Sequence, residues 1–207
     1  MIRGAFAGPA IEWGWAGSAL ALESGDLHVV APFAEGALVA LIDGLGHGEE
    51  AAAAASAAVA ILESHPQESV KSLLLRCHEG MRKTRGAVMS LVSFDARNAS
   101  MTWTGVGNVA AILLRGTDAA DPAGAALVAR GGVVGYQLPA PRIATLRIWR
   151  GDLLVMTTDG IRPGFAAGLA TTHAPQEIAE SILATGATGT DDAHVLVARY
   201  HGWENAA

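Results

Sequence analysis

Aspartates at the ends of apolar runs are the residues of this sequence best suited to chemistry. Each adjoins a glycine or a second aspartate, and the set consists of Asp26, Asp43, Asp159, Asp191 and Asp192. Aspartate is a favoured turn and helix-cap residue, so any one of them has an ordinary structural explanation. Because the pattern recurs at several predicted strand ends, we expect these carboxylates to converge at one edge of the fold.

Carboxylates gathered at one edge repel one another unless a cation holds them together. Ligand sets made only of oxygen select hard ions, Mg²⁺ or Mn²⁺, over zinc or copper. Two such ions a short distance apart can activate a water molecule and clamp a phosphoryl group. The aspartates therefore indicate metal-dependent phosphoryl chemistry as a hypothesis.

Two glycine-rich segments suggest nucleotide binding instead. Residues 44–49 follow a predicted strand and open a predicted helix, but Glu49 stands where a dinucleotide fingerprint has its third glycine, and Asp43 would face the pyrophosphate with the wrong charge. Residues 105–110 satisfy G-x-G-x-x-A, yet β-favouring residues follow them in place of a helix. We therefore interpret this second segment as a tight hairpin in which glycine permits a positive φ.

Alternating apolar and turn-forming stretches predict the elements that must hold the aspartates. The predicted strands cover 16–22, 27–31, 37–42, 87–94, 100–104, 109–115, 143–149, 153–158 and 193–200, with one more short strand between the loops 116–124 and 131–141. Helices are predicted over the alanine-rich stretch 49–64, over 174–185 and after Pro66. The helix after Pro66 repeats apolar residues on one face, namely Val70, Leu73, Leu74, Cys77 and Met81. Strands, then helices, then strands linked mostly by hairpins indicate an α+β fold with antiparallel sheets.

Composition limits the class of protein. The chain has 207 residues, a formal net charge of −6 and a single cysteine. This length fits one domain over residues 1–207, and the acidic balance argues against a nucleic-acid partner. The longest apolar run, 51–62, is too short for a bilayer, which needs about 20 residues, so we expect no membrane association. Lone Cys77 excludes an intramolecular disulfide, is compatible with a cytoplasmic location, and is predicted to pack in the core.

The motifs, taken in order, resemble those of the metal-dependent type-2C (PPM) protein phosphatases, and within them the SpoIIE-like branch. The resemblance spans residues 25–200 and rests on Gly25-Asp26, the block Val39–Gly48, Gly105–Asn108, Thr157–Gly160 and Asp191-Asp192. It implies a sandwich of two antiparallel β-sheets with α-helices on both outer faces. It also implies a dinuclear metal centre at one edge of that sandwich.

The resemblance also implies roles for individual residues. Asp43 would bridge two Mn²⁺ or Mg²⁺ ions, and the Gly44 carbonyl would complete one shell. Asp26, Asp159 and Asp191 would supply further direct or water-mediated ligands. Water activated by the ions would then attack phosphorus in line, without a phosphoenzyme.

Some positions depart from the family's pattern. Many members carry a histidine two residues after the bridging aspartate, where this chain has Leu45. His47 is predicted to have a structural role, such as a hydrogen bond at the start of the following helix. A small hydroxyl residue is common where this chain has His194. In the last motif we choose Asp191 as the ligand, and expect Asp192 to cap or to lie behind the ligands.

The function implied by the resemblance is hydrolysis of phosphoserine or phosphothreonine in a protein. The branch includes phosphatases of the stressosome, so the implied substrates are phosphorylated STAS-domain scaffold proteins, dephosphorylated as negative feedback on stress signalling. The alternatives are a phosphatase of an anti-sigma-factor antagonist and a non-catalytic phosphoprotein-binding relative. We expect a monomer or weak dimer, and name Arg3 and the loop 162–165 as candidates for substrate contact.

Overall fold

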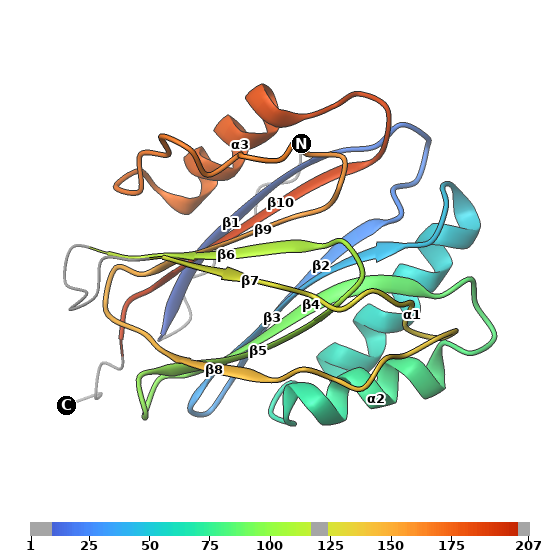
Figure 1. Cartoon of the computed structure of the whole chain (residues 1–207), viewed down its shortest axis with the longest axis horizontal. Helices are drawn as coiled ribbons and strands as arrows, with labels where there is room; N and C mark the ends of the chain where they lie inside the picture. The colour runs from blue at the N-terminus through green and yellow to red at the C-terminus, as the bar shows by residue number, and fades with distance from the viewer. Residues whose placement is uncertain (1–9, 117–123, 203–207) are drawn as a thin grey trace.

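Two antiparallel five-stranded sheets lie face to face in the computed structural model, which describes residues 10–116 and 124–202 (Figure 1). The β10 sheet has the order β1 (Ile11–Ser18), β10 (Ala193–Tyr200), β9 (Leu153–Thr157), β6 (Ala110–Leu114) and β7 (Ala125–Leu127). The β3 sheet has the order β2 (Asp26–Phe33), β3 (Gly36–Gly44), β4 (Ala87–Asp95), β5 (Ser100–Val106) and β8 (Ala144–Arg147). The predicted antiparallel α+β architecture is confirmed.

Helices cover the two outer faces of this sandwich. The helices α1 (Glu49–Ser64) and α2 (Val70–Gly80) pack on the β3 sheet, and α3 (Pro175–Gly186) packs on β1 and β10. Figure 1 shows α1 and α2 on one side of the molecule and α3 on the other. None of the described helices is long and apolar enough to cross a membrane.

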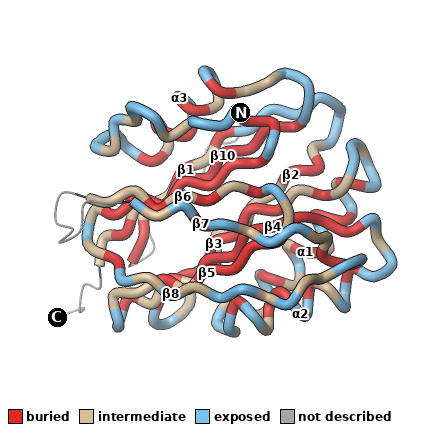
Figure 2. Tube along the Cα trace, viewed as in Figure 1, coloured by how far each residue is buried: buried red, intermediate tan, exposed pale blue. Residues whose placement is uncertain are grey.

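Side chains of the central strands alternate between two buried layers. In β3, Leu41 packs between the two sheets, whereas Ile42 packs toward α1 and α2. Residues 37–42 are at most 3% exposed. Because both faces of β3 are covered, its sequence is a continuous apolar run and not an alternating one. Figure 2 shows that burial is concentrated in these central strands.

Alanine lets α1 lie close to the β3 sheet. The side chains of Ala54, Ala55 and Ala58 are fully buried, in one cluster with Leu38 and Ile42 of β3. Small methyl side chains permit this close approach, so the alanine-rich segment serves packing as well as helix propensity.

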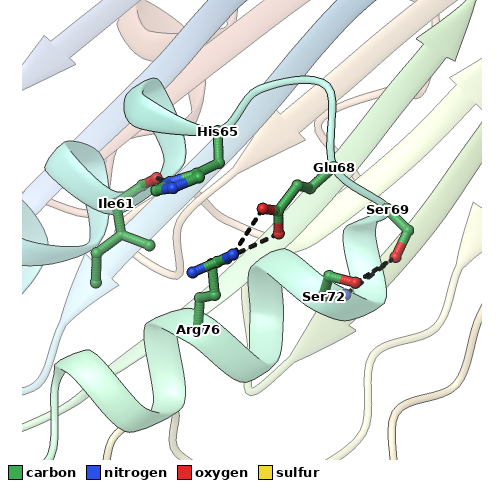
Figure 3. Close-up of polar contacts among 6 residues, drawn as sticks. All are labelled: Ile61, His65, Glu68, Ser69, Ser72 and Arg76. Atoms are coloured by element: carbon green, nitrogen blue, oxygen red, sulfur yellow. Dashed lines mark hydrogen bonds and ion pairs between the residues drawn. The ribbon is translucent and has the colours of Figure 1, made fainter.

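Polar contacts fasten the turn between α1 and α2 (Figure 3). Ser69 caps α2 by accepting a 3.1 Å hydrogen bond from the Ser72 backbone N–H. Arg76 donates two 2.8 Å hydrogen bonds to the carboxylate of Glu68. An exposed ion pair of this kind contributes little to stability, because water and salt screen it. The cap and the buried apolar face therefore contribute most of the stability of α2.

Cys77 lies in the buried layer between α2 and the β3 sheet. Its side chain has no exposed surface, and burial raises the pKa of the thiol to about 12. A thiol that stays protonated is a poor nucleophile. Cys77 is therefore a packing residue, as predicted.

The first strand begins and ends earlier than predicted. It covers Ile11–Ser18 and not 16–22, and it pairs with β10 along its whole length, from Ile11 opposite Tyr200 to Ser18 opposite Ala193. Residues 19–25 form a loop instead. The prediction was wrong because the bounds of β1 are set by its pairing with β10, at the other end of the chain. Local apolar content does not reveal that pairing.

The segment Gly105–Asn108 is not the predicted tight hairpin. It carries the chain out of β5, which belongs to the β3 sheet, and into β6, which belongs to the β10 sheet. Gly107 does have the expected positive φ, at 94°. A Cβ at that position would collide with the side chain of Val88. Glycine is required here by the crossing between sheets.

A larger side chain on the buried face of α1 tests this packing. We expect Ala58→Leu to lower the free energy of unfolding by about 1–3 kcal/mol, because the close approach of helix and sheet leaves no room for the added methylenes. Chemical denaturation measures the change. Ala60→Leu, on the exposed face of the same helix, is the matched control. Equal stability of the two variants would contradict the packing described above.

Candidate metal centre

Asp26 and Asp43 are neighbours across two adjacent strands. Asp26 begins β2, Asp43 lies near the end of β3, and the antiparallel register sets them directly opposite each other. The Gly44 backbone N–H donates a 3.0 Å hydrogen bond to the Gly25 carbonyl, which holds the two strand ends together. The hairpin between β2 and β3 thus brings two of the predicted ligands together.

Asp159 and Asp191 reach the same edge from the β10 sheet. Asp159 follows β9 and Asp191 precedes β10, and the Thr158 backbone N–H donates a 3.1 Å hydrogen bond to the His194 carbonyl between them. Both aspartates line one cavity of about 850 Å³, together with Asp43. The two sheets therefore present their carboxylates to a shared space.

Asp26 is placed differently from the other three predicted ligands. Its side chain is only 4% exposed and lines a separate cavity of about 350 Å³ together with Trp15, His28 and His194. The Thr158 hydroxyl donates a 2.7 Å hydrogen bond to its Oδ2 atom. This contact holds the Asp26 carboxylate in one orientation behind the wall of the larger cavity.

The carboxylates are poorly compensated by positive charge. Burial, followed by repulsion from neighbouring aspartates, raises the pKa of Asp43 to about 8. Burial and the same neighbours raise the pKa of Asp26 to about 7, against the opposing hydrogen bond from Thr158. The pKa of Asp159 is also raised, by burial and by Asp191. Among the described residues, no lysine or arginine lines the larger cavity.

The donor set fits Mg²⁺ or Mn²⁺. It consists of the buried carboxylate of Asp26, the half-buried one of Asp43 and the exposed ones of Asp159 and Asp191. Such oxygen ligands suit hard divalent cations. Within residues 10–116 and 124–202, no three aspartate, glutamate, histidine or cysteine side chains converge closely enough to enclose an ion by themselves. Ions bound here would therefore keep several water ligands, as Mg²⁺ commonly does in proteins.

Asp192 holds the backbone around the site. Its side chain is 6% exposed, and its two oxygens accept hydrogen bonds of 2.8 Å from the Leu20 N–H and 2.7 Å from the Gly25 N–H. Asp192 does not line the larger cavity, whereas Asp191 does. Since Gly25 adjoins Asp26, the Asp192 carboxylate ties the start of β10 to the start of β2. The choice of Asp191 as the ligand remains a prediction.

The predicted hydrogen bond of His47 at the start of α1 is wrong. Gly48 is the N-cap residue, with a φ of 73°, and no side chain caps the helix. His47 is exposed and lines the larger cavity together with Leu45 and Asp159. Glycine at this cap leaves the histidine side chain directed to the cavity and not to the helix.

His194 and His28 form a buried pair beside Asp26. The Nε2 atom of His194 lies 2.9 Å from the Nδ1 atom of His28, and the His194 ring stacks on Trp15 with centroids 5.0 Å apart. Burial lowers the pKa of His194 to about 3 and that of His28 to about 4. Both imidazoles are therefore neutral at physiological pH, and a bulky ring fills the position where a small hydroxyl residue is common.

Sequence reasoning gave no individual role to two polar residues that contact the aspartates. The Asn108 amide donates a 2.6 Å hydrogen bond to Asp159, and Thr158 donates to Asp26. Both lie in motifs that carried the family resemblance, so their position in those motifs was the available signal. Their contacts depend on the pairing of distant strands, which the sequence does not display.

The two candidates for substrate contact, Arg3 and the loop 162–165, have different outcomes. Arg3 lies outside the described residues. None of the residues 162–165 lines the larger cavity. Phe165 packs instead with Ile178 and Ile182 of α3. The geometry therefore gives this loop a structural role under the helix.

A comparison with known families identifies the class of protein. Residues 34–201 match the family model described as Stage II sporulation protein E (SpoIIE). The matched segment runs from before β3 to the end of β10 and contains Asp43, Asp159 and Asp191. The chain therefore belongs to the SpoIIE family, as its motifs predict.

RsbX and a chain of a structure that concerns the bacterial stressosome are among the similar proteins. The phosphoserine phosphatase RsbX of Bacillus subtilis (strain 168) is 27% identical over 159 residues, which make up 75% of this chain and 76% of RsbX. A structure of RsbX in complex with magnesium matches with a TM-score of 0.82 at 20% identity, covering 96% of this chain and 100% of that one. A chain of a structure described as "The bacterial stressosome: a modular system that has been adapted to control secondary messenger signaling" matches with a TM-score of 0.84 at 31% identity, covering 91% of this chain and 99% of that one.

The structural class is also that of the PP2C phosphatases. The PP2C phosphatase domain of SpoIIE from Bacillus subtilis matches with a TM-score of 0.73 at 22% identity, covering 99% of this chain and 70% of that one. The predicted sandwich fold of the type-2C phosphatases is confirmed by these matches.

Removing the Asp192 carboxylate tests its role around the site. We expect Asp192→Ala to weaken Mn²⁺ binding by about 10- to 100-fold, because residues behind the ligands of a metal orient those ligands. Isothermal titration calorimetry measures the dissociation constant. The control is Asp152→Ala at the other end of β9, since Asp152 is 2% exposed and accepts backbone hydrogen bonds from Gly116 and Trp149. An equal loss of affinity in both variants would show a general effect on stability.

The raised pKa values predict how stability depends on pH without metal. The pKa of an aspartate in the unfolded chain is near its ordinary value of 3.8, whereas burial and neighbouring carboxylates raise the pKa of Asp26 and Asp43 in the folded chain to about 7 and about 8. The folded state thus binds more protons between these values, so its stability falls as pH rises from about 4 to about 8. We expect the melting temperature in EDTA to fall across this range, and Asp43→Asn to reduce the slope. A melting temperature that rises toward pH 8 would contradict the assignment.

Proposed function

We propose that this chain is a metal-dependent protein serine/threonine phosphatase whose site is the cavity lined by Asp43, Asp159 and Asp191. The observation that carries the proposal is the convergence of oxygen-only ligands from both sheets on one cavity that no described lysine or arginine lines. Membership of the SpoIIE family supports the same class of activity. Bound Mg²⁺ or Mn²⁺, which we propose as two ions, would supply an activated water molecule and stabilise charge on the phosphoryl group.

The residues of the chain have distinct tasks in this proposal. Asp43, Asp159 and Asp191 bind the cations, with the Gly44 carbonyl as a further ligand. Asp26 completes the set from behind the cavity wall, where the hydrogen bond from Thr158 fixes its orientation. The Asn108 amide holds Asp159 in the same way.

His47 is a candidate for the proton donor. Its exposed imidazole lines the cavity with the carboxylates. Hydrolysis of a phosphoserine leaves a serine oxygen that needs a proton, and imidazole is the commonest general acid in enzymes. This role replaces the structural one predicted from the sequence.

The proposed substrates are phosphorylated STAS-domain scaffold proteins of a stressosome. The similarity to RsbX, a phosphoserine phosphatase, and the 31% identity to a chain of a structure described as concerning the bacterial stressosome support this substrate class. Dephosphorylation of such scaffolds would act as negative feedback on stress signalling. The match to the SpoIIE family favours a second candidate, a phosphatase of an anti-sigma-factor antagonist.

The activity itself is tested with p-nitrophenyl phosphate and Mn²⁺. We expect Asp43→Asn to lower kcat/KM by at least about 1,000-fold, because the substitution removes a carboxylate on which charge stabilisation depends. Asp95→Asn is the control, since Asp95 lies at the opposite end of β3 and β4, across from Gly36. EDTA should abolish turnover of the wild type. Hydrolysis that survives EDTA or Asp43→Asn would contradict a metal mechanism at this site.

The substrate is tested by comparing two classes of phosphoprotein under the same conditions. Phosphorylated STAS-domain scaffold proteins should lose phosphate faster than phosphorylated anti-sigma-factor antagonists. Release of inorganic phosphate measures both reactions. A preference for the antagonists would favour the second candidate function.

A further inference from the structure

The loop between β1 and β2, residues 19–25, forms a ridge between two hollows of the surface. On one side, Leu20 and Ala21 line the cavity that holds the aspartates. On the other side, Ala21, Leu22 and Glu23 line a second hollow of about 360 Å³, together with Gly48 and Glu49 at the start of α1. A polypeptide with its phosphorylated residue in the first cavity can therefore cross the ridge into the second hollow.

The ridge exposes apolar surface that a soluble protein normally covers. Leu22 has its whole side chain in solvent, at 105% exposure, and Leu20 is 57% exposed. Burying a leucine side chain against a partner is favourable, because it removes apolar surface from water. Because the exposed leucines adjoin the catalytic cavity, their position favours contact with the molecule that enters it.

The ridge is held in place despite its exposure. Asp192 accepts hydrogen bonds from the Leu20 and Gly25 backbone N–H groups, and the Ser24 hydroxyl accepts one of 3.1 Å from the Asp26 N–H. These contacts fix both ends of the loop to the strand ends that carry Asp26 and Asp191. The two ends of the ridge are therefore held in place before a partner binds.

The second hollow has an acidic lining. Glu23 and Glu49 contribute carboxylates, and the described residues that line this hollow include no basic side chain. Glu50, the other carboxylate in the first turn of α1, is already paired with Arg85. Glu23 and Glu49 are thus placed to attract a positively charged group of the partner.

We propose that this ridge, residues 19–25 with Glu49, is a docking surface for the protein substrate. Its occupant is the segment next to the phosphoserine, which carries an apolar side chain for Leu20 and Leu22 and a lysine or arginine for Glu23 and Glu49. The proposal rests on the phosphatase function proposed above and names the sequence context that this phosphatase prefers. It makes the site selective for sequence as well as for phosphate.

Two phosphopeptides test the preference. Both carry one phosphoserine, flanked in the first by leucine and arginine and in the second by serine and glutamate. We expect the wild type to have a kcat/KM about tenfold higher for the first peptide, mainly through KM. Leu22→Ser should reduce this ratio about fivefold, and Glu23→Gln with Glu49→Gln about threefold, consistent with the modest strength of exposed contacts.

Matched variants separate docking from general effects. Leu75→Ser alters another exposed leucine, which is 43% exposed on α2, and Glu63→Gln alters an exposed carboxylate at the far end of α1. Both should keep the wild-type ratio. A ratio near one in the wild type, or an equal fall in Leu75→Ser and Leu22→Ser, would overturn the docking surface.

Turnover of p-nitrophenyl phosphate by the wild type distinguishes a failure of the docking surface from a failure of the proposed function. This substrate lacks a peptide, so it reports on the phosphatase site alone. Turnover of p-nitrophenyl phosphate with equal kcat/KM for the two peptides would overturn only the docking surface. No turnover of any phosphorylated substrate would overturn both the docking surface and the proposed function.

Discussion

Repulsion among neighbouring carboxylates is the constraint on which the rest of this structure depends. Asp26 and Asp43 lie opposite each other on paired strands, and Asp159 and Asp191 approach from the second sheet. The neighbouring residues supply hydrogen bonds but little positive charge: Thr158 and Asn108 donate to two of these carboxylates, and Asp192 fixes the backbone between them. A divalent cation would supply the charge that this arrangement lacks, and this is why we propose the site as a receptor for metal.

The two-sheet origin of the ligands couples this site to the folded state. Asp26 and Asp43 come from the β3 sheet, whereas Asp159 and Asp191 flank strands of the β10 sheet. Asp43 of one sheet shares a cavity with Asp159 and Asp191 of the other only when the sheets are packed face to face. Metal that binds this arrangement and not the unfolded chain stabilises the whole sandwich by mass action. Stability and activity should therefore respond together to the metal concentration.

The sequence predicts local features well where one physical signal dominates. The apolar run of β3, the alanine-rich α1 and the turn-linked aspartates were all recognisable, since each follows from burial, helix propensity or turn chemistry. Features that depend on distant partners could not be recognised in the sequence. The register of β1 is imposed by β10, and Gly105–Asn108 crosses between the sheets. The same holds for the contacts of Asp192 with Leu20 and Gly25, which join segments far apart in the chain.

The buried cysteine has a consequence for the conditions under which this protein can work. Oxidants such as peroxide attack thiolates, and phosphatases that use a cysteine nucleophile lose activity in this way. Here Cys77, the single cysteine of the chain, is enclosed between α2 and a sheet, and its pKa of about 12 keeps it protonated. The proposed ligands are carboxylates, which peroxide does not oxidise. Activity at the proposed site would therefore not depend on a reduced thiol.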